Sequence, residues 1–134
     1  MEHEYLSWFA YAENDLRSAK HLTTLHPQPI ELICYLSQQC FEKYLKGYLV
    51  YQNIAPPKTH DLVHLCTMCM EFSHAFEQLF DMCELLSDYA VQPKYPNEMQ
   101  LFEHHAQKAL ACAQQIKAFA PLRELREKLS EENS

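Results

Sequence analysis

The chain has 134 residues, 48% of them hydrophobic and 22% charged, which suits a single globular domain long enough to bury a core. Its net charge of −7 argues against a dedicated nucleic-acid-binding protein, which needs a basic face, but leaves room for a local basic pocket. A single glycine and few β-branched residues argue against hairpins and sheets.

No apolar run approaches the ~20 residues that a membrane span needs, so we expect no membrane association. The opening residues, Met-Glu-His-Glu, lack the basic flank and the apolar stretch of a secretory signal. We therefore expect a cytoplasmic protein whose six cysteines are reduced thiols and form no disulfide framework.

The first predicted helix covers residues 4–25. Its apolar residues recur at steps of three and four, the spacing of an amphipathic helix: Tyr5, Phe9, Ala12, Leu16 and Ala19. The segment His26-Pro27-Gln28-Pro29 ends this helix, because each proline lacks an amide hydrogen and disfavours helix in the residue before it. Such a short connection makes the next helix an antiparallel neighbour.

The second predicted helix, residues 30–51, is the centre of the expected fold. Apolar side chains occupy nearly every side of it, so other helices must cover it. One stripe is a polar seam of residues a helical turn apart, Gln38, Glu42 and Lys46. We interpret Gln38 and Glu42 as architectural and expect function nearer the C-terminal end of the seam and the His60 loop. Glu42 should pair with a basic or hydroxyl group on a neighbouring helix, such as Lys20 or Tyr89, because an unpaired buried carboxylate is costly.

Three further helices are predicted over residues 62–69, 73–89 and 98–119. Thr59 or Asp61 could cap the first of these, since both side chains carry an oxygen that accepts amide hydrogens. The fold expected is all-α, an up-down antiparallel helical bundle of four to five helices. We assign the bundle to residues 1–120 and a charged C-terminal tail, with helical character left open, to residues 121–134.

Metal binding is not expected, and neither is any cofactor. Cys66 and Cys69 form one Cys-x-x-Cys, but a structural zinc site usually needs a second such pair, so these thiols are interpreted as core residues. His60 and His64 are four residues apart and could chelate a metal only if they share a helical face. His104 and its neighbour His105 point in different directions on a helix and suit one ion poorly.

Several cationic and aromatic residues are scattered along the chain but could converge: Lys43, Lys46, Lys58, His60, Lys94 and Tyr95. If they meet, they form a local cationic pocket suited to phosphate. The alternative is that these lysines are solvated on the surface, and the spacing alone leaves both open. A glycine-rich phosphate loop is absent, since Gly47 is the only glycine.

Four short motifs, in order and at suitable intervals, resemble those of the HEPN family (higher eukaryotes and prokaryotes nucleotide-binding). They are Asn14-Asp15-Leu16 with Ala19, the Gln-x-x-x-Glu-Lys-x-x-Lys pattern from Gln38 to Lys46, Lys58-Thr59-His60-Asp61-Leu62, and Tyr89 followed by Pro93-Lys94-Tyr95-Pro96. The resemblance covers about residues 11–119. It implies an all-helical bundle that commonly forms homodimers.

The resemblance also implies a choice of functions. Many prokaryotic members act with a minimal nucleotidyltransferase as a toxin–antitoxin pair, some are metal-independent RNases, and others bind nucleotides without cleaving RNA. The RNases carry an Arg followed after four to six residues by a His, so that Arg stabilises phosphorane charge and His moves a proton. Arg17 has His21 at the wrong interval, no His follows Arg123 or Arg126, and Lys94 stands where Arg is frequent.

The expected function is therefore nucleotide binding without catalytic residues, together with a minimal nucleotidyltransferase partner. Lys46, His60 and Lys94 are assigned to phosphate contact and Tyr95 to base stacking. One alternative is an RNase toxin with a degenerate motif, in which His60 or His104 is the base and Lys94 the charge stabiliser, although RNA is the less favoured partner. Another is a non-catalytic dimeric interaction module.

Overall fold

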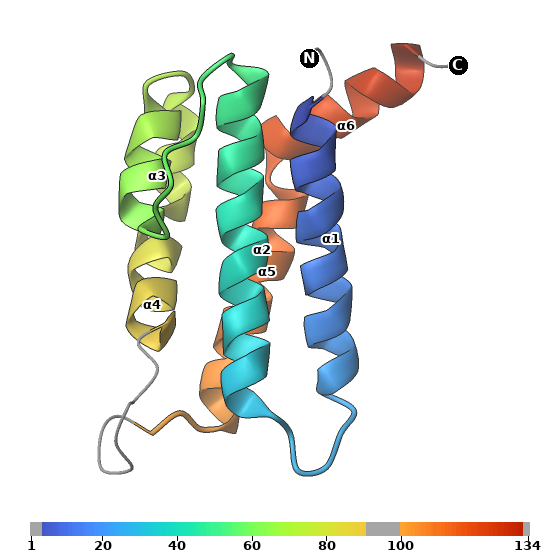
Figure 1. Cartoon of the computed structure of the whole chain (residues 1–134), viewed down its shortest axis with the longest axis vertical. Helices are drawn as coiled ribbons and strands as arrows, with labels where there is room; N and C mark the ends of the chain where they lie inside the picture. The colour runs from blue at the N-terminus through green and yellow to red at the C-terminus, as the bar shows by residue number, and fades with distance from the viewer. Residues whose placement is uncertain (1–3, 91–99, 133–134) are drawn as a thin grey trace.

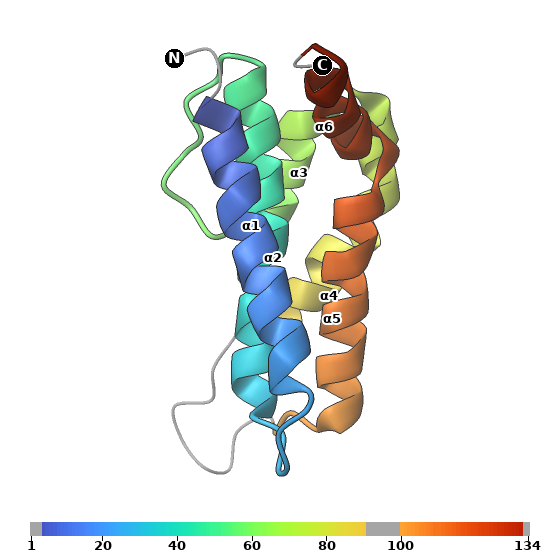
Figure 2. The ribbon, with the colours of Figure 1, turned by 90° about the vertical axis from the view of Figure 1, so that its right-hand side faces the viewer.

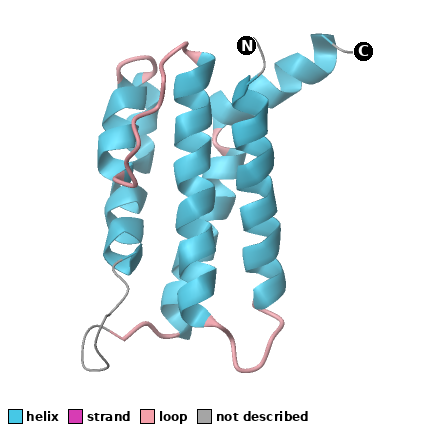
Figure 3. Ribbon diagram, viewed as in Figure 1, coloured by secondary structure: helices cyan, strands magenta, loops and turns pink. Residues whose placement is uncertain are grey.

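The structure, a computed structural model, describes residues 4–90 and 100–132. These ranges contain six α-helices and one 3₁₀-helix and no strand (Figures 1 and 3). The elements in chain order are α1 (Glu4–Leu22), α2 (Ile30–Tyr51), α3 (Leu62–Met70), η1 (His74–Leu79), α4 (Phe80–Ala90), α5 (Glu103–Ala118) and α6 (Ala120–Glu132). The predicted all-α bundle is confirmed, but the described helices outnumber the four to five expected.

Helix α2 is the central element, as its apolar surface predicts. It packs against α1, α3, α4 and α5, and Figures 1 and 2 show α1 antiparallel beside it with α5 behind both. Phe41, Tyr44 and Leu45 lie at the centre of the core with at most 1% of their surfaces exposed. A helix that is apolar on nearly all sides is stable only with such complete cover.

Helices α1 and α2 pack closely at Gly47. A methyl group added there would meet the ring of Phe9 at 2.6 Å and the Cβ of Trp8 at 3.0 Å. The lone glycine of the chain therefore lets the two helices come together.

The loop after α2 doubles back along the bundle before α3 begins (Figure 1). Asn53 adopts a left-handed conformation with φ of 64°, and the Ile54 amide donates to the Leu49 carbonyl at 2.9 Å, a common way to end a helix. At the other end of the loop, Asp61 caps α3 by accepting the His64 amide at 3.2 Å. The loop is thus fixed at both ends, which positions His60 against α2.

Two predicted helices have different bounds from those expected. Residues 74–79 form a tighter 3₁₀-helix before α4, so the single helix predicted over residues 73–89 is divided. Helix α5 begins at Glu103, because the His105 ring accepts the Phe102 amide at 2.8 Å and closes the helix there. Lys94 and Tyr95 lie outside the described residues.

The segment after residue 120 is largely helical. Its helix α6 buries Leu122 completely and places the Arg126 guanidinium over the Tyr44 ring, 5.7 Å from the centroid. Arg126 also donates to the Lys117 carbonyl. Helix α6 is therefore joined to both α5 and the core helix α2.

All six cysteines are buried and free. Burial, together with the nearby Glu31 carboxylate, raises the pKa of the Cys34 thiol to about 11. Across the described ranges, no helix has the length and apolar character that crossing a membrane requires.

Candidate functional site

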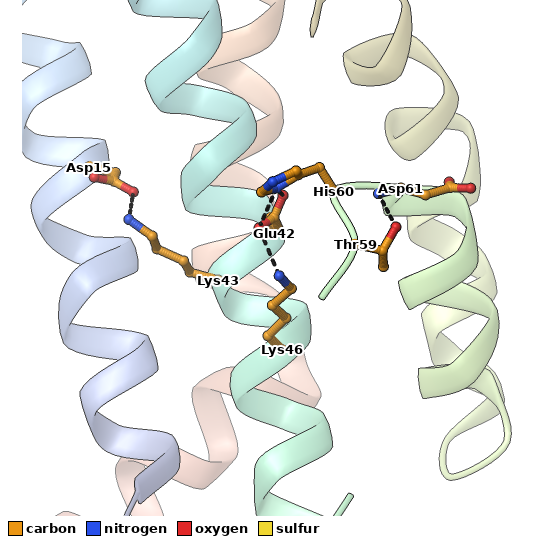
Figure 4. A network of polar contacts seen from close by, with 7 residues as sticks. All are labelled: Asp15, Glu42, Lys43, Lys46, Thr59, His60 and Asp61. Atoms are coloured by element: carbon orange, nitrogen blue, oxygen red, sulfur yellow. Dashed lines mark hydrogen bonds and ion pairs between the residues drawn. The ribbon is translucent and has the colours of Figure 1, made fainter. Parts of the chain in front are cut away.

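Glu42 is the centre of a polar cluster on α2. Only 3% of the residue is exposed, and its carboxylate meets two cationic or potentially cationic groups (Figure 4). Its Oε2 lies 3.1 Å from the Lys46 Nζ, one helical turn away, and its Oε1 lies 2.9 Å from the His60 Nδ1. The three residues, which we call the Glu42 cluster, join the central helix to the loop before α3.

The observed partners of Glu42 differ from the expected ones. Lys20 is exposed on α1, and Tyr89 contacts the His105 ring edge-on with centroids 5.2 Å apart. The buried carboxylate does have partners, as expected. They are Lys46 of the same helix and His60 of the loop before α3. Helical spacing alone could identify Lys46 and could not identify His60.

Lys46 is buried together with its counter-charge. Only 9% of its side chain is exposed, and its ammonium lies 5.9 Å from the centroid of the Trp8 ring on α1. A carboxylate on one side and an aromatic face on another both stabilise the positive charge. The ammonium has three N–H donors, so the bond to Glu42 leaves others for a ligand.

His60 is the exposed member of the Glu42 cluster, with 77% of its side chain accessible. A carboxylate only accepts hydrogen bonds, so the Nδ1 that contacts Glu42 carries the hydrogen. The other ring nitrogen, Nε2, makes no hydrogen bond within the described part of the chain. This arrangement leaves Nε2 available either to accept a proton or, in the protonated ring, to donate to an anion.

Lys43, the neighbouring cation, belongs to a different contact. Its Nζ lies 2.6 Å from the Asp15 carboxylate (Figure 4). The same Nζ lies 5.9 Å from the centroid of the Tyr11 ring. It therefore links α1 to α2 beside the Glu42 cluster, on the same face. Lys58 is exposed on the loop, and Gln38 is buried one turn before Glu42.

Lys46 and His60, whose convergence the sequence left open, both contact Glu42, while Lys94 and Tyr95 fall outside the described ranges. His64 is exposed on α3 and takes no part in the cluster. Among the described residues, no group of three or more His, Cys, Asp or Glu is arranged to hold a metal ion.

The family model of the HEPN domain matches residues 5–126. The chain belongs to the HEPN family. Its structure is similar to the crystal structure of ST0689, an archaeal HEPN homologue, with a TM-score of 0.67 and 24% sequence identity over 90% of this chain and 96% of that one. That likeness bears on the fold alone. No curated protein sequence matches the chain.

The arginines of this HEPN chain serve contacts other than an Arg–His pair. Arg126 packs over Tyr44, and the Arg123 guanidinium donates to the Ala118 carbonyl at 3.4 Å. Arg17 lies exposed on α1, one turn before His21. None of the three arginines lies in the Glu42 cluster. The permanently charged cation of that cluster is Lys46.

One feature of the HEPN chain was missed at the level of sequence. The outer face of α1 lines a pocket of about 410 Å³ through Glu4, Ser7, Trp8 and Tyr11. These residues recur at steps of three, one and three and so share a helical face, which adjoins the stripe of Tyr5 and Phe9 that enters the core. The spacing of these four residues is the signal in the sequence that could have indicated the pocket.

Proposed function

We propose that this HEPN protein binds nucleotides, with the Glu42 cluster contacting their phosphates. The observation that supports this most directly is the meeting of Lys46 and His60 on one buried carboxylate. Two nitrogen donors from different segments are held in fixed positions on a chain that is otherwise acidic. Such preorganised donors favour an anion because little entropy is lost when it binds.

The charges of the Glu42 cluster fit a phosphate when the imidazole is protonated. Glu42 and Lys46 then cancel, and the ring of His60 carries one net positive charge near the surface. The same proposal assigns Lys94 to a further phosphate contact and Tyr95 to base stacking.

Calorimetric titration with ATP and GTP tests the nucleotide proposal. We expect His60→Ala to weaken binding about tenfold or more, the usual effect of losing one charge-assisted hydrogen bond. His64→Ala is the matched control, because His64 is an exposed histidine one turn further on that contacts no member of the cluster, and it should bind normally. Absence of binding heat for the unmodified protein would overturn the proposal.

We also propose that the protein acts with a minimal nucleotidyltransferase in a two-component, toxin–antitoxin-like system. Family membership and the four motifs support this. Co-expression with a minimal nucleotidyltransferase encoded beside its gene should give a complex on affinity purification. A complex that forms equally well with His60→Ala and Lys46→Met but shows no nucleotide dependence would instead favour the non-catalytic interaction module.

Homodimer formation is part of the same proposal. Large apolar side chains remain exposed on α2, among them Leu32 at 46% and Tyr35 at 46%. Burial of such side chains between two copies would be favourable. Light scattering should give twice the monomer mass, and Tyr35→Glu should reduce it; a monomer at all concentrations would contradict this part.

A second candidate function, metal-independent RNA cleavage, is favoured by the contact between His60 and Glu42. A carboxylate that fixes the Nδ1–H tautomer leaves Nε2 as a base, the arrangement used to take a proton from a hydroxyl. Lys46 would then offer charge for the developing phosphorane. Purified protein should cleave RNA in the presence of EDTA, and His60→Ala should not; RNA left intact by the unmodified protein would exclude this function.

A further inference from the structure

The pocket on the outer face of α1 lies next to the Glu42 cluster. Trp8 is the link, because its indole ring lines the pocket and also lies 5.9 Å from the Lys46 Nζ. The volume of about 410 Å³ is within the range of small-molecule sites. A ligand in this pocket could therefore extend a polar group toward Lys46 and His60.

Each of the two aromatic rings of the pocket contacts a lysine of α2. Lys46 lies over Trp8 and Lys43 lies over Tyr11, each 5.9 Å from the ring centroid, and Lys43 is itself tied to Asp15. Rings held in this way lose little freedom when a flat molecule stacks on them. Stacking on aromatic side chains is the general way in which proteins hold nucleobases.

Glu4 supplies the selective group of the pocket. Its carboxylate makes no ion pair or hydrogen bond with any residue of the described ranges, and it also lines an adjoining hollow formed by residues of the loop after α2. A carboxylate accepts two hydrogen bonds and donates none. It therefore matches a base edge with two adjacent N–H donors, which guanine has at N1 and N2, whereas adenine, cytosine and uracil each place an acceptor beside the donor.

We propose that this pocket is the base-binding part of the nucleotide site and that it takes guanine. Trp8 and Tyr11 would stack on the base, Glu4 would accept its two N–H groups, and the phosphate would extend to Lys46 and His60. The inference rests on the proposed function, since a base subsite has meaning only if nucleotides bind. It adds the class of base and the residues that select it.

Trp8 makes the test direct, because it is the only tryptophan of the chain. Titration with GMP, AMP, CMP and UMP should quench the tryptophan fluorescence, with GMP binding about a hundredfold more tightly than the others, the scale set by two charge-assisted hydrogen bonds. Glu4→Gln should abolish that preference while keeping the quenching. Glu31→Gln is the matched control, since Glu31 is an exposed acid in the first turn of α2 and should leave the preference intact.

Calorimetry on the same samples separates the two proposals. Heat of nucleotide binding without tryptophan quenching, or with equal affinity for all four bases, would overturn the guanine subsite and leave the nucleotide site standing. Absence of both heat and quenching would overturn the proposed function and this inference together. Trp8→Phe, which keeps a stacking ring, should weaken GMP binding less than Trp8→Leu; equal binding by both variants would also count against stacking.

Discussion

At the scale of single residues, the buried charges of α2 decide both stability and chemistry. Removing a carboxylate and a lysine from water is unfavourable, and the attraction between Glu42 and Lys46 offsets that cost only while both are present. The indole face of Trp8 and the ring of His60 complete the surroundings of the pair. The pair is therefore sensitive to the loss of either member.

Glu42→Ala should lower the free energy of unfolding by about 3–5 kcal/mol, because it leaves the Lys46 ammonium buried without its counter-charge. The double variant Glu42→Ala with Lys46→Met should recover much of that loss, since no charge is then left uncompensated. Urea denaturation of these two variants and of Lys46→Met alone measures the interaction free energy between Glu42 and Lys46. Additive effects would show that the two side chains do not stabilise each other.

Alkaline pH should destabilise the protein through its buried thiols. The pKa of Cys34 is raised by burial to about 11, so the folded state keeps a proton that the unfolded chain loses near the ordinary value of 9.0. The stabilisation is complete below that ordinary value and is lost as the pH rises toward the folded-state pKa.

The urea midpoint, measured in reductant, should therefore fall as the pH rises from about 9 to about 11. Cys34→Ala should reduce the slope of that fall. An identical slope in both proteins would show that Cys34 does not contribute.

The pairing of Glu42 with Lys46 was predictable from the sequence, whereas the contact between Glu42 and His60 was not. Helical spacing puts Glu42 and Lys46 together, because residues four apart lie on one stripe. It cannot reveal that His60 returns to the same carboxylate, since that depends on how a loop of irregular backbone folds. The roles expected of Lys94 and Tyr95 stay predictions.

At the scale of elements, the contact between α1 and α2 depends on a missing side chain. Gly47→Ala should destabilise the protein by about 1–3 kcal/mol, because the new methyl group would overlap the buried Phe9 ring. In an exposed helix the same change would be stabilising by about 1 kcal/mol. Chemical denaturation measures the change in the free energy of unfolding. Ser18→Ala, on the exposed face of α1, is the control for helix propensity. A Gly47→Ala variant that is more stable than the unmodified protein would disprove the close packing.

The cap of α3 stabilises both the helix and the loop that carries His60. Asp61→Ala should cost about 1 kcal/mol, because the His64 amide loses its acceptor. Asp61→Asn retains an acceptor oxygen and should cost less. Thermal unfolding compares the two, and equal stability of Asp61→Ala and the unmodified protein would contradict the role of the cap.

The bounds of α2 agree with the expected residues 30–51, because prolines lie on both sides of that helix. The division between η1 and α4 was not predictable, since a 3₁₀-helix and an α-helix share nearly the same apolar spacing over so few residues. The start of α5 depends on a hydrogen bond from the Phe102 amide to the His105 ring, which no propensity scale includes.

At the scale of the whole molecule, the C-terminal segment begins inside the packed region. Truncation after Ala120 removes the fully buried Leu122 and the guanidinium over Tyr44. We expect it to lower the free energy of unfolding by about 2–4 kcal/mol, the usual cost of losing a large buried side chain. Truncation after Lys128 should change the free energy of unfolding little. If the two truncated proteins were equally stable, the bundle would end at residue 120 instead.

The contact between α1 and α2 has a further consequence, for the order in which the chain assembles. The two helices are joined by a short turn, so bringing them together closes a small loop at low entropic cost. The ion pair between Glu13 and Lys117 instead joins residues 104 positions apart and requires the return of α5. We therefore expect Gly47→Ala to slow refolding and Lys117→Ala mainly to speed unfolding in stopped-flow measurements. The helical hairpin around Gly47 would then be the folding nucleus, with α5 docking after the rate-limiting step.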